Sequence, residues 1–156
     1  MIVRNAESAD HPSVIDVMDA WWGGRHMSPL LPRLFFVHFR DTSFIAEEDG
    51  ELVAFFVGFL SQSRPDEAYI HFVGVRPDRR GSGIARDLYE RFFDVARANG
   101  RSIVRCVTAP VNTGSIAFHR NMGFEIEPGD GEVDGIPVHR DHDGPGVDRV
   151  LFWRRI

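Results

Sequence analysis

One loop constrains the fold of this chain more than any other segment. Residues 73–85 read V-G-V-R-P-D-R-R-G-S-G-I-A, so an apolar strand breaks at Pro77 and a glycine-spaced loop opens a helix. Gly81 and Gly83 leave backbone N–H groups uncovered at the helix start, where unpaired donors and the helix dipole both favour an anion. The segment therefore predicts a strand–loop–helix unit that holds a pyrophosphate.

The rest of the chain alternates helical and strand patterns without repeats or low-complexity linkers. A first helix is expected to be capped by Asp10 and ended by Gly23, with later helices at 33–39, 84–98 and 113–121. Strands are expected at 43–47, 52–60, 68–75, 102–108, 124–127 and 149–153. This order predicts an α/β or α+β fold with a mixed sheet, in a single domain over residues 1–156.

Composition excludes several classes of protein. Hydrophobic residues make up 43% and charged residues 26% of the chain, as in ordinary soluble domains. The longest apolar run, Leu52 to Leu60, is far shorter than the roughly 20 residues of a membrane-spanning helix. The first residues lack the apolar core of a signal peptide, and Cys106 is the single cysteine. We therefore expect a cytoplasmic protein without a membrane partner, with Cys106 a buried hydrophobe.

Charge is distributed unevenly along the chain. The formal net charge is −5, which argues against a nucleic-acid partner, and arginine supplies all 18 basic residues. Between Glu125 and Asp148, eight acidic side chains stand against one arginine, Arg140. This skew indicates either a solvated loop or a mouth that attracts a cationic substrate. The D-H-D run at 141–143 lacks the further ligands of a calcium loop, so no metal is expected.

Three interpretations of the glycine loop follow from the residues alone. A phosphate-binding Walker loop is excluded because it needs a lysine, and the chain has none. A dinucleotide-binding oxidoreductase is a remote alternative, because Arg86 stands where that fingerprint needs a small residue for close helix packing. A plain glycine turn also joins a strand to a helix, but it needs neither the second glycine nor the arginine pair at 79–80.

A second segment extends the pattern into a family resemblance. Arg80, Gly83 and Ala85 match the R-x-x-G-x-G/A signature of the GNAT superfamily of acetyl-coenzyme A-dependent N-acetyltransferases. About 30 residues later Asn112, Ser115, Phe118 and Gly123-Phe124 resemble the superfamily segment N-x-x-A/S-x-x-x-Y-x-x-x-G-F. The order of elements before the loop also resembles the family, so the likeness covers essentially the whole chain.

The resemblance implies a fold and a cofactor site. It implies a mostly antiparallel central sheet flanked by helices and splayed at the cofactor-binding strand. Acetyl-coenzyme A is the implied cosubstrate, with its pyrophosphate on the loop amides and its pantetheine arm paired with the strand as an added strand would be. The implied cofactor-binding residues are Val73, Gly74, Val75, Arg80, Gly81, Ser82, Gly83, Ile84, Ala85, Asn112 and Ser115.

Catalytic residues follow from what amine acetylation requires. The amine must lose a proton, the carbonyl oxygen must be stabilised, and the thiolate leaves more easily when protonated. His119 stands where the family has a tyrosine acid, so a histidine acid or cofactor contact is expected there, with packing as the alternative. Tyr69, His71 and Val73 are expected to share one strand face, and His71 is the candidate base. Glu47, Glu48, Asp66 and a water relay are the more remote options for that base.

We therefore expect an enzyme that moves an acetyl group directly from acetyl-coenzyme A to the primary amine of a small or amino-acid-like acceptor. A covalent acetyl-Cys106 carrier is disfavoured because no basic partner lies near it in the sequence. The aromatic residues at 21–22 and 35–36, with Arg25 and His26, are expected either in the core or at the acceptor. The alternative is a noncatalytic acyl-coenzyme A-binding or regulatory module of the same fold. A homodimer is left open.

Overall fold

The computed structural model describes the whole chain, Met1–Ile156. The strands are β1 (Ile2–Asn5), β2 (Phe44–Glu48), β3 (Glu51–Leu60), β4 (Glu67–Val75), β5 (Ile103–Thr108), β6 (Glu125–Ile126), β7 (Gly131–Val133), β8 (Ile136–Val138) and β9 (Val150–Arg155). The helices are α1 (His11–Trp21), α2 (Leu34–His38), α3 (Ile84–Ala98) and α4 (Thr113–Asn121). Each helix and strand expected from the sequence is present.

A single seven-stranded sheet organises the molecule. Its strand order is β1-β2-β3-β4-β5-β9-β6, and a separate two-stranded hairpin is formed by β7 and β8. Every neighbouring pair in the large sheet is antiparallel except β4 and β5, which α3 connects in parallel. The expected mixed, mostly antiparallel sheet is confirmed.

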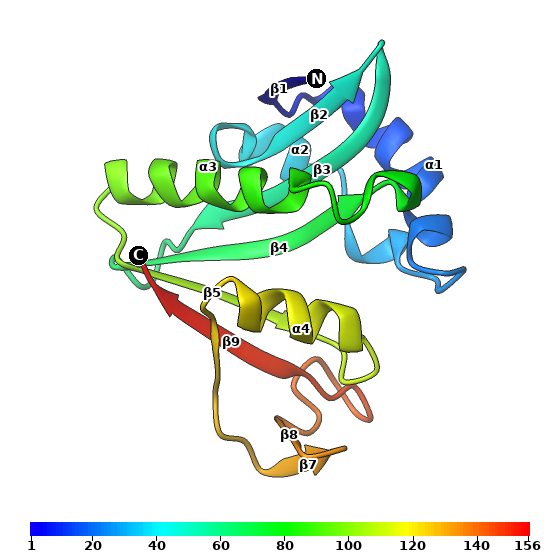
Figure 1. Cartoon of the computed structure of the whole chain (residues 1–156). Helices are drawn as coiled ribbons and strands as arrows, with labels where there is room; N and C mark the ends of the chain where they lie inside the picture. The colour runs from blue at the N-terminus through cyan, green and yellow to red at the C-terminus, as the bar shows by residue number, and fades with distance from the viewer.

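Helices cover the sheet from both sides, and each side has its own hydrophobic core (Figure 1). Helices α3 and α4 pack over one face and share the larger core with alternate residues of β3, β4, β5 and β9. Helices α1 and α2 pack over the other face, where Phe55 and Val57 of β3 join a smaller core. The layers suit the broad apolar stripe of α3, on which Leu88, Phe92 and Ala96 are all buried.

Strands β4 and β5 pair at one end and diverge at the other. Their parallel register covers only Glu67 to Tyr69 of β4, whereas β3 pairs with β4 as far as Val75. In Figure 1 the two strands meet near the C-terminus and separate toward the start of α3 and of α4. One edge of β4 beyond Tyr69 therefore has no neighbouring strand, and the splay implied by the family resemblance is confirmed.

A β-bulge lies inside β4 and changes which face its residues use. Val57 of β3 pairs with Phe72 and Gly58 pairs with Ile70, so His71 is the extra residue. His71 stacks on Phe35 of α2, and Phe72 contacts Trp22 on the same side. Val73 packs against the larger core on the opposite face. The expectation that Val73 shares a face with Tyr69 and His71 is therefore wrong, because the bulge breaks the alternation.

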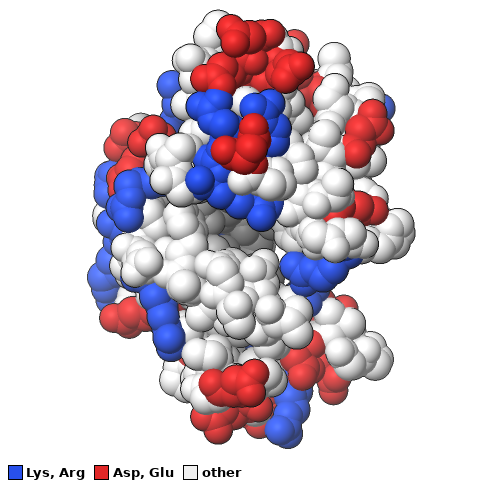
Figure 2. Space-filling model, turned by 45° about the vertical axis from the view of Figure 1, so that its right-hand side comes forward, with Lys and Arg blue, Asp and Glu red and all other residues white.

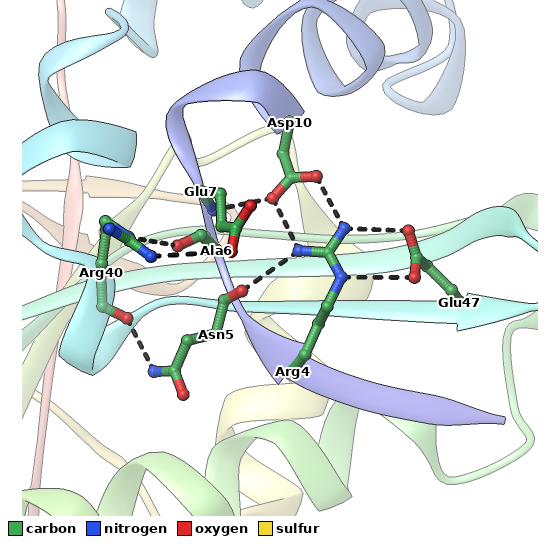
Figure 3. A network of polar contacts seen from close by, with 7 residues as sticks. All are labelled: Arg4, Asn5, Ala6, Glu7, Asp10, Arg40 and Glu47. Carbon is green, nitrogen blue, oxygen red and sulfur yellow. Dashed lines mark hydrogen bonds and ion pairs between the residues drawn. The ribbon is translucent and has the colours of Figure 1, made fainter.

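The N-terminal strand is fixed by an arginine between two carboxylates (Figure 3). The Arg4 guanidinium donates to Asp10 at 2.7 and 2.9 Å and to Glu47 at 2.9 and 3.3 Å. These bonds raise the pKa of Arg4 and lower the pKa of Asp10. Asp10 makes no cap hydrogen bond to α1 and accepts instead from the amide of Glu7. Asp10 is the N-cap residue of α1, as expected, but its side chain makes no cap bond because this arginine and the Glu7 amide occupy its carboxylate.

Replacing Arg4 with methionine is expected to lower the free energy of unfolding by about 1–3 kcal/mol. That loss lies between an exposed ion pair at ~0.2–1 kcal/mol and a fully buried one at ~3–5 kcal/mol. Urea unfolding of the variant measures it, with Arg97→Met as the control, because Arg97 and its partner Asp94 are both exposed. Equal losses in the two variants would show that the Arg4 network contributes no more than a surface pair.

Candidate active site

The loop between β4 and α3 presents a run of backbone amides without partners. The backbone N–H groups of residues 81–86 donate to no acceptor within the protein, and those of 84–86 belong to the free first turn of α3. Gly81 and Gly83 have φ of +74° and +90°, a left-handed conformation that favours glycine. The loop is therefore shaped to direct several N–H donors at one anion.

Arginine side chains flank this loop, but the nearest ones already have partners. Arg80 donates to the carbonyl of Val75 at 3.2 Å and to that of Trp21 at 2.5 Å. Arg79 forms an ion pair with Glu48. In Figure 2, which brings the open end of the splay forward, blue side chains gather above a hollow in the middle of this face. The amides are thus the free donors at the loop, and the arginines supply positive potential beside them.

The unpaired edge of β4 offers backbone groups to a ligand. The amide of Arg76 donates to Val53 of β3, so by alternation the backbone groups of Val73 and Val75 point away from β3 toward the gap. The bond from Arg80 to the Val75 carbonyl fits this direction. An extended amide-bearing chain can therefore pair with Val73 and Val75 as an additional strand.

Gly74 makes room for aromatic packing on the other side of the same strand. A Cβ atom on Gly74 would lie 2.5 Å from Phe55 and 3.1 Å from Trp22. The glycine therefore lets β4 approach the smaller core closely. The bulge that a strand glycine can indicate lies instead at His71.

Helix α4 begins at Asn112 and carries the second family motif. The Asn112 Oδ1 accepts from the amide of Ser115 at 3.1 Å, which confirms Asn112 as the helix cap. Four residues on, the His119 Nδ1 lies 2.7 Å from the carbonyl of Ser115 and 3.2 Å from its hydroxyl. A carbonyl only accepts, so Nδ1 carries the proton.

His119 lies inside the larger core. Its Nε2 lies 2.8 Å from the hydroxyl of Tyr89, and only 6% of the residue is exposed. With the proton on Nδ1, the Tyr89 hydroxyl donates to Nε2. The ring also stacks on Phe152 at 4.7 Å. Both nitrogens thus have protein partners, and burial lowers the pKa of His119, so the ring is neutral at pH 7.

This buried histidine is expected to make stability depend on pH. The folded pKa lies below the ordinary value of 6.5, so below that pH the unfolded chain binds a proton that the folded chain excludes. The free energy of unfolding therefore decreases as the pH is lowered, by up to ~1.4 kcal/mol per pH unit. His119→Phe should reduce the slope measured by urea unfolding between about pH 7 and pH 5, leaving the part due to His71, whose pKa burial also lowers. The exposed-site control His26→Phe should keep the full slope. A wild-type slope in His119→Phe would contradict this origin.

His71 lies on the opposite face of the sheet from His119. Its Nε2 lies 2.7 Å from the carbonyl of Leu30, so Nε2 donates and the lone pair is on Nδ1. The ring stacks on Phe35 with centroids 4.3 Å apart, which fixes its plane. Burial lowers the pKa of His71, so the imidazole is neutral and can accept a proton near pH 7.

The segment before β9 contains an ion pair between Asp143 and Arg149. Burial raises the pKa of Tyr69 to about 12, and the charge of Asp143 adds to that rise. The same charge only partly offsets the burial that lowers the pKa of His71. Arg149 donates to Asp143 at 2.7 Å and opposes that rise in Tyr69. Val150 and Phe152 point into the larger core, so alternation along β9 directs Arg149, which is bonded to Asp143, to the sheet face that carries His71. No motif indicated Arg149.

The other side chains weighed as bases or nucleophiles lie in other settings. Glu47 and Glu48 pair with Arg4 and Arg79. Asp66 is exposed in the loop before β4. Cys106 is buried, and burial raises the pKa of its thiol, so it stays protonated. A covalent acetyl-cysteine step therefore has no support in the geometry.

The chain belongs to the acetyltransferase (GNAT) family, whose model matches residues 9–124. This membership confirms the resemblance drawn from the glycine loop and from the Asn112 segment. It removes the dinucleotide-binding alternative, which also needs a mostly parallel sheet that the structure does not have.

Relatives and solved structures are consistent with this family. An L-2,4-diaminobutyric acid acetyltransferase of Nocardia farcinica is 33% identical over 80 residues, covering 51% of this chain and 42% of the relative. The chain thus spans less than half of that relative's length. The structure of Ard1 from Thermoplasma volcanium superposes with a TM-score of 0.78 at 20% identity, covering 99% of this chain and 97% of that one.

One of the similar solved structures contains bound ligands. Diaminobutyrate acetyltransferase from Paenibacillus lautus, in complex with L-2,4-diaminobutyric acid and coenzyme A, has a TM-score of 0.69 at 21% identity, covering 97% of this chain and 92% of that one. At such identities the likeness shows the shared fold. No helix of this chain combines the length and apolarity that crossing a membrane requires.

Proposed function

We propose that this protein is an N-acetyltransferase that moves an acetyl group from acetyl-coenzyme A directly to the primary amine of a small, amino-acid-like acceptor. The proposal is carried by two features that occur together: the free amides at 81–86 and the edge of β4 at Val73 and Val75, which has no neighbouring strand. Coenzyme A presents a pyrophosphate, which suits the loop amides at the end of β4, and an amide-bearing arm, which suits the free edge of the same strand. Relatives named for diaminobutyrate support an amino-acid-like acceptor.

The residues present fit coenzyme A. The pyrophosphate would lie on the amides of residues 81–86, and the arm would pair with Val73 and Val75. Ser82 and Ser115 offer hydroxyls near the two helix starts, and Arg80 reaches a phosphate only by releasing the carbonyls of Val75 and Trp21. The cofactor-binding set expected from the family thus remains our proposal, with Gly74 acting through close packing and Asn112 through the cap of α4.

His71 is the proposed base. The acceptor amine is protonated near neutral pH, and the neutral Nδ1 of His71 can take its proton directly or through water. The backbone N–H groups on the free edge of β4 can stabilise the oxygen of the tetrahedral intermediate. The thioester C–S bond then breaks, and the coenzyme A thiolate leaves and is protonated by solvent or by a protein group.

His119 occupies the sequence position of the family's acid, and it remains our candidate for that role. In the arrangement described here its one N–H bonds the Ser115 carbonyl. Donation from His119 to sulfur would therefore require this bond and the Tyr89 bond to rearrange. A thiolate is a good leaving group, so the reaction does not depend on that acid.

Turnover across a panel of amines separates the enzyme from a noncatalytic acyl-coenzyme A-binding module. We expect free thiol to appear from acetyl-coenzyme A only when an acceptor is present, with acetylated amine identified by mass in equal amount. Binding of acetyl-coenzyme A without thiol release on any acceptor would favour the module. A His71→Phe variant that keeps coenzyme A affinity but loses turnover would assign the chemistry to this site.

A further inference from the structure

We propose that Arg149, on the face of the sheet that carries His71, binds the carboxylate of an amino acid acceptor and so selects amino acids over simple amines. This inference rests on the proposed function, because it names the part of the acceptor that the same site reads. Arg149 would act as a specificity-determining residue, separate from the base and the cofactor loop.

The position of Arg149 is fixed by the sheet. Its backbone exchanges two hydrogen bonds with His139, at 2.8 and 3.1 Å, and the next residue, Val150, pairs with Thr108 of β5. Val150 and Phe152 point into the larger core, so alternation directs Arg149 to the opposite face. That face is the one on which Tyr69 and His71 lie.

The side chain of Arg149 is partly satisfied and partly free. Its side chain is only 18% exposed, its Nε donates to Asp143, and its Nη1 donates to the carbonyl of Asp148 at 3.3 Å. A guanidinium has five N–H donors, so the Nη2 group and one Nη1 hydrogen remain available for a carboxylate. The two existing bonds hold the planar group in place, which reduces the entropy lost on binding a ligand.

Other arginines on this side are less suited to the role. Arg105 lies between the carboxylates of Glu67 and Glu127, which already balance its charge. Arg80 is turned to backbone carbonyls on the cofactor side. Arg149 has only the half-exposed Asp143 as an acidic partner, and that carboxylate can also attract the ammonium group of the acceptor.

The same face of the sheet carries this pair and the proposed base, by the alternation of β9 and the stacking of His71 on Phe35. Asp143 acts on both His71 and Tyr69, and Arg149 acts on Tyr69. An acceptor whose carboxylate lies on Arg149 would therefore direct its amine along the same face toward His71. The acidic segment then has two roles, to attract the amine and to orient Arg149.

The test compares acceptors that differ only in the carboxylate. L-2,4-diaminobutyrate and 1,3-diaminopropane form such a pair, and the readout is the ratio of their kcat/KM values. In Arg149→Gln we expect that ratio to fall by about 30- to 100-fold through loss of a charge-assisted bond, with 1,3-diaminopropane turned over as by the wild type. Arg149→Lys should restore part of the ratio, because it keeps the charge without the fork.

Asp143→Asn is the control for a merely structural role. If Arg149 only anchored the loop through Asp143, both variants would lower kcat/KM for the two acceptors equally, and the inference would be overturned. We expect Asp143→Asn to keep most of the ratio, because it removes attraction for the ammonium group that both acceptors share.

Binding decides the inference independently of turnover. Calorimetric titration of L-2,4-diaminobutyrate into the protein saturated with coenzyme A should give a Kd that rises in Arg149→Gln. An unchanged Kd, or no binding to the wild type, would overturn the role of Arg149. A wild type that acetylates only amines without a carboxylate would also overturn it, while acetyl transfer from acetyl-coenzyme A to a primary amine would stand. A wild type that binds the amino acid but acetylates no amine would contradict the proposed function alone.

Discussion

Ser82→Glu is expected to weaken coenzyme A binding by about 100-fold. Ser82 lies among the unpartnered amides of the loop, and its hydroxyl donates to the carbonyl of Arg79. A carboxylate there would accept from those amides and repel a pyrophosphate. Two like charges about 5 Å apart at an effective dielectric constant of ~20 repel by ~3 kcal/mol. That energy corresponds to about two orders of magnitude in Kd.

Calorimetric titration of coenzyme A measures the loss, and Ser63→Glu is its control. Ser63 is an exposed loop residue before β4, so this variant adds the same charge away from the glycine loop. We expect it to bind coenzyme A within about twofold of the wild type, apart from weak long-range repulsion. Equal losses in both variants would mean that overall charge, and not the loop, governs binding. Unchanged affinity in Ser82→Glu would place the pyrophosphate elsewhere.

His71→Phe is expected to lower kcat/KM by about 10²- to 10³-fold, in the range of a lost general base. Phenylalanine keeps the stacking on Phe35 but has no lone pair in place of Nδ1. Burial lowers the pKa of His71, so the wild-type rate should rise with pH through a value below the ordinary 6.5 and then level off, apart from titration of the amine. The variant should lose that step.

The exposed His38 on α2 provides the matched control for this variant. His38→Phe makes the same replacement on the helix that carries Phe35, and it should leave kcat/KM and the pH profile unchanged. Coenzyme A affinity should be kept in both variants, because neither side chain lies at the cofactor loop. A His71→Phe enzyme with the wild-type pH profile would assign His71 to packing and leave a water relay as the base.

The arrangement of elements could be predicted because most of it is encoded in local patterns. The apolar stripe of α3, the acidic turn at Asp49-Gly50 and the Asn112 cap each depend on neighbouring residues, and the structure has all of them. β1 was not predicted, because its four residues show no periodicity and pair only at the sheet edge. The β7–β8 hairpin was missed for a similar reason, since each of its strands has three residues.

The glycine loop of the candidate site could be expected from local sequence, whereas the arrangement around His71 and Arg149 could not. The glycine loop is a local signal, whereas the bulge that puts His71 on the same face as Phe72 depends on the register with β3. The partners of Arg80 and His119 come from α1 and α3, far along the chain. Arg149 belongs to no motif. Its only sequence signal is that it follows the acidic segment directly and precedes a strand with alternating buried residues.

A crystal structure with coenzyme A and L-2,4-diaminobutyrate bound tests the central claim most directly. We predict the pyrophosphate on the amides of residues 81–86, the pantetheine arm along Val73 and Val75, and the sulfur in the gap between β4 and β5. The acceptor amine should then lie between that sulfur and His71. A cofactor bound with its pyrophosphate away from the glycine loop, or with its thiol outside the splay, would contradict the account.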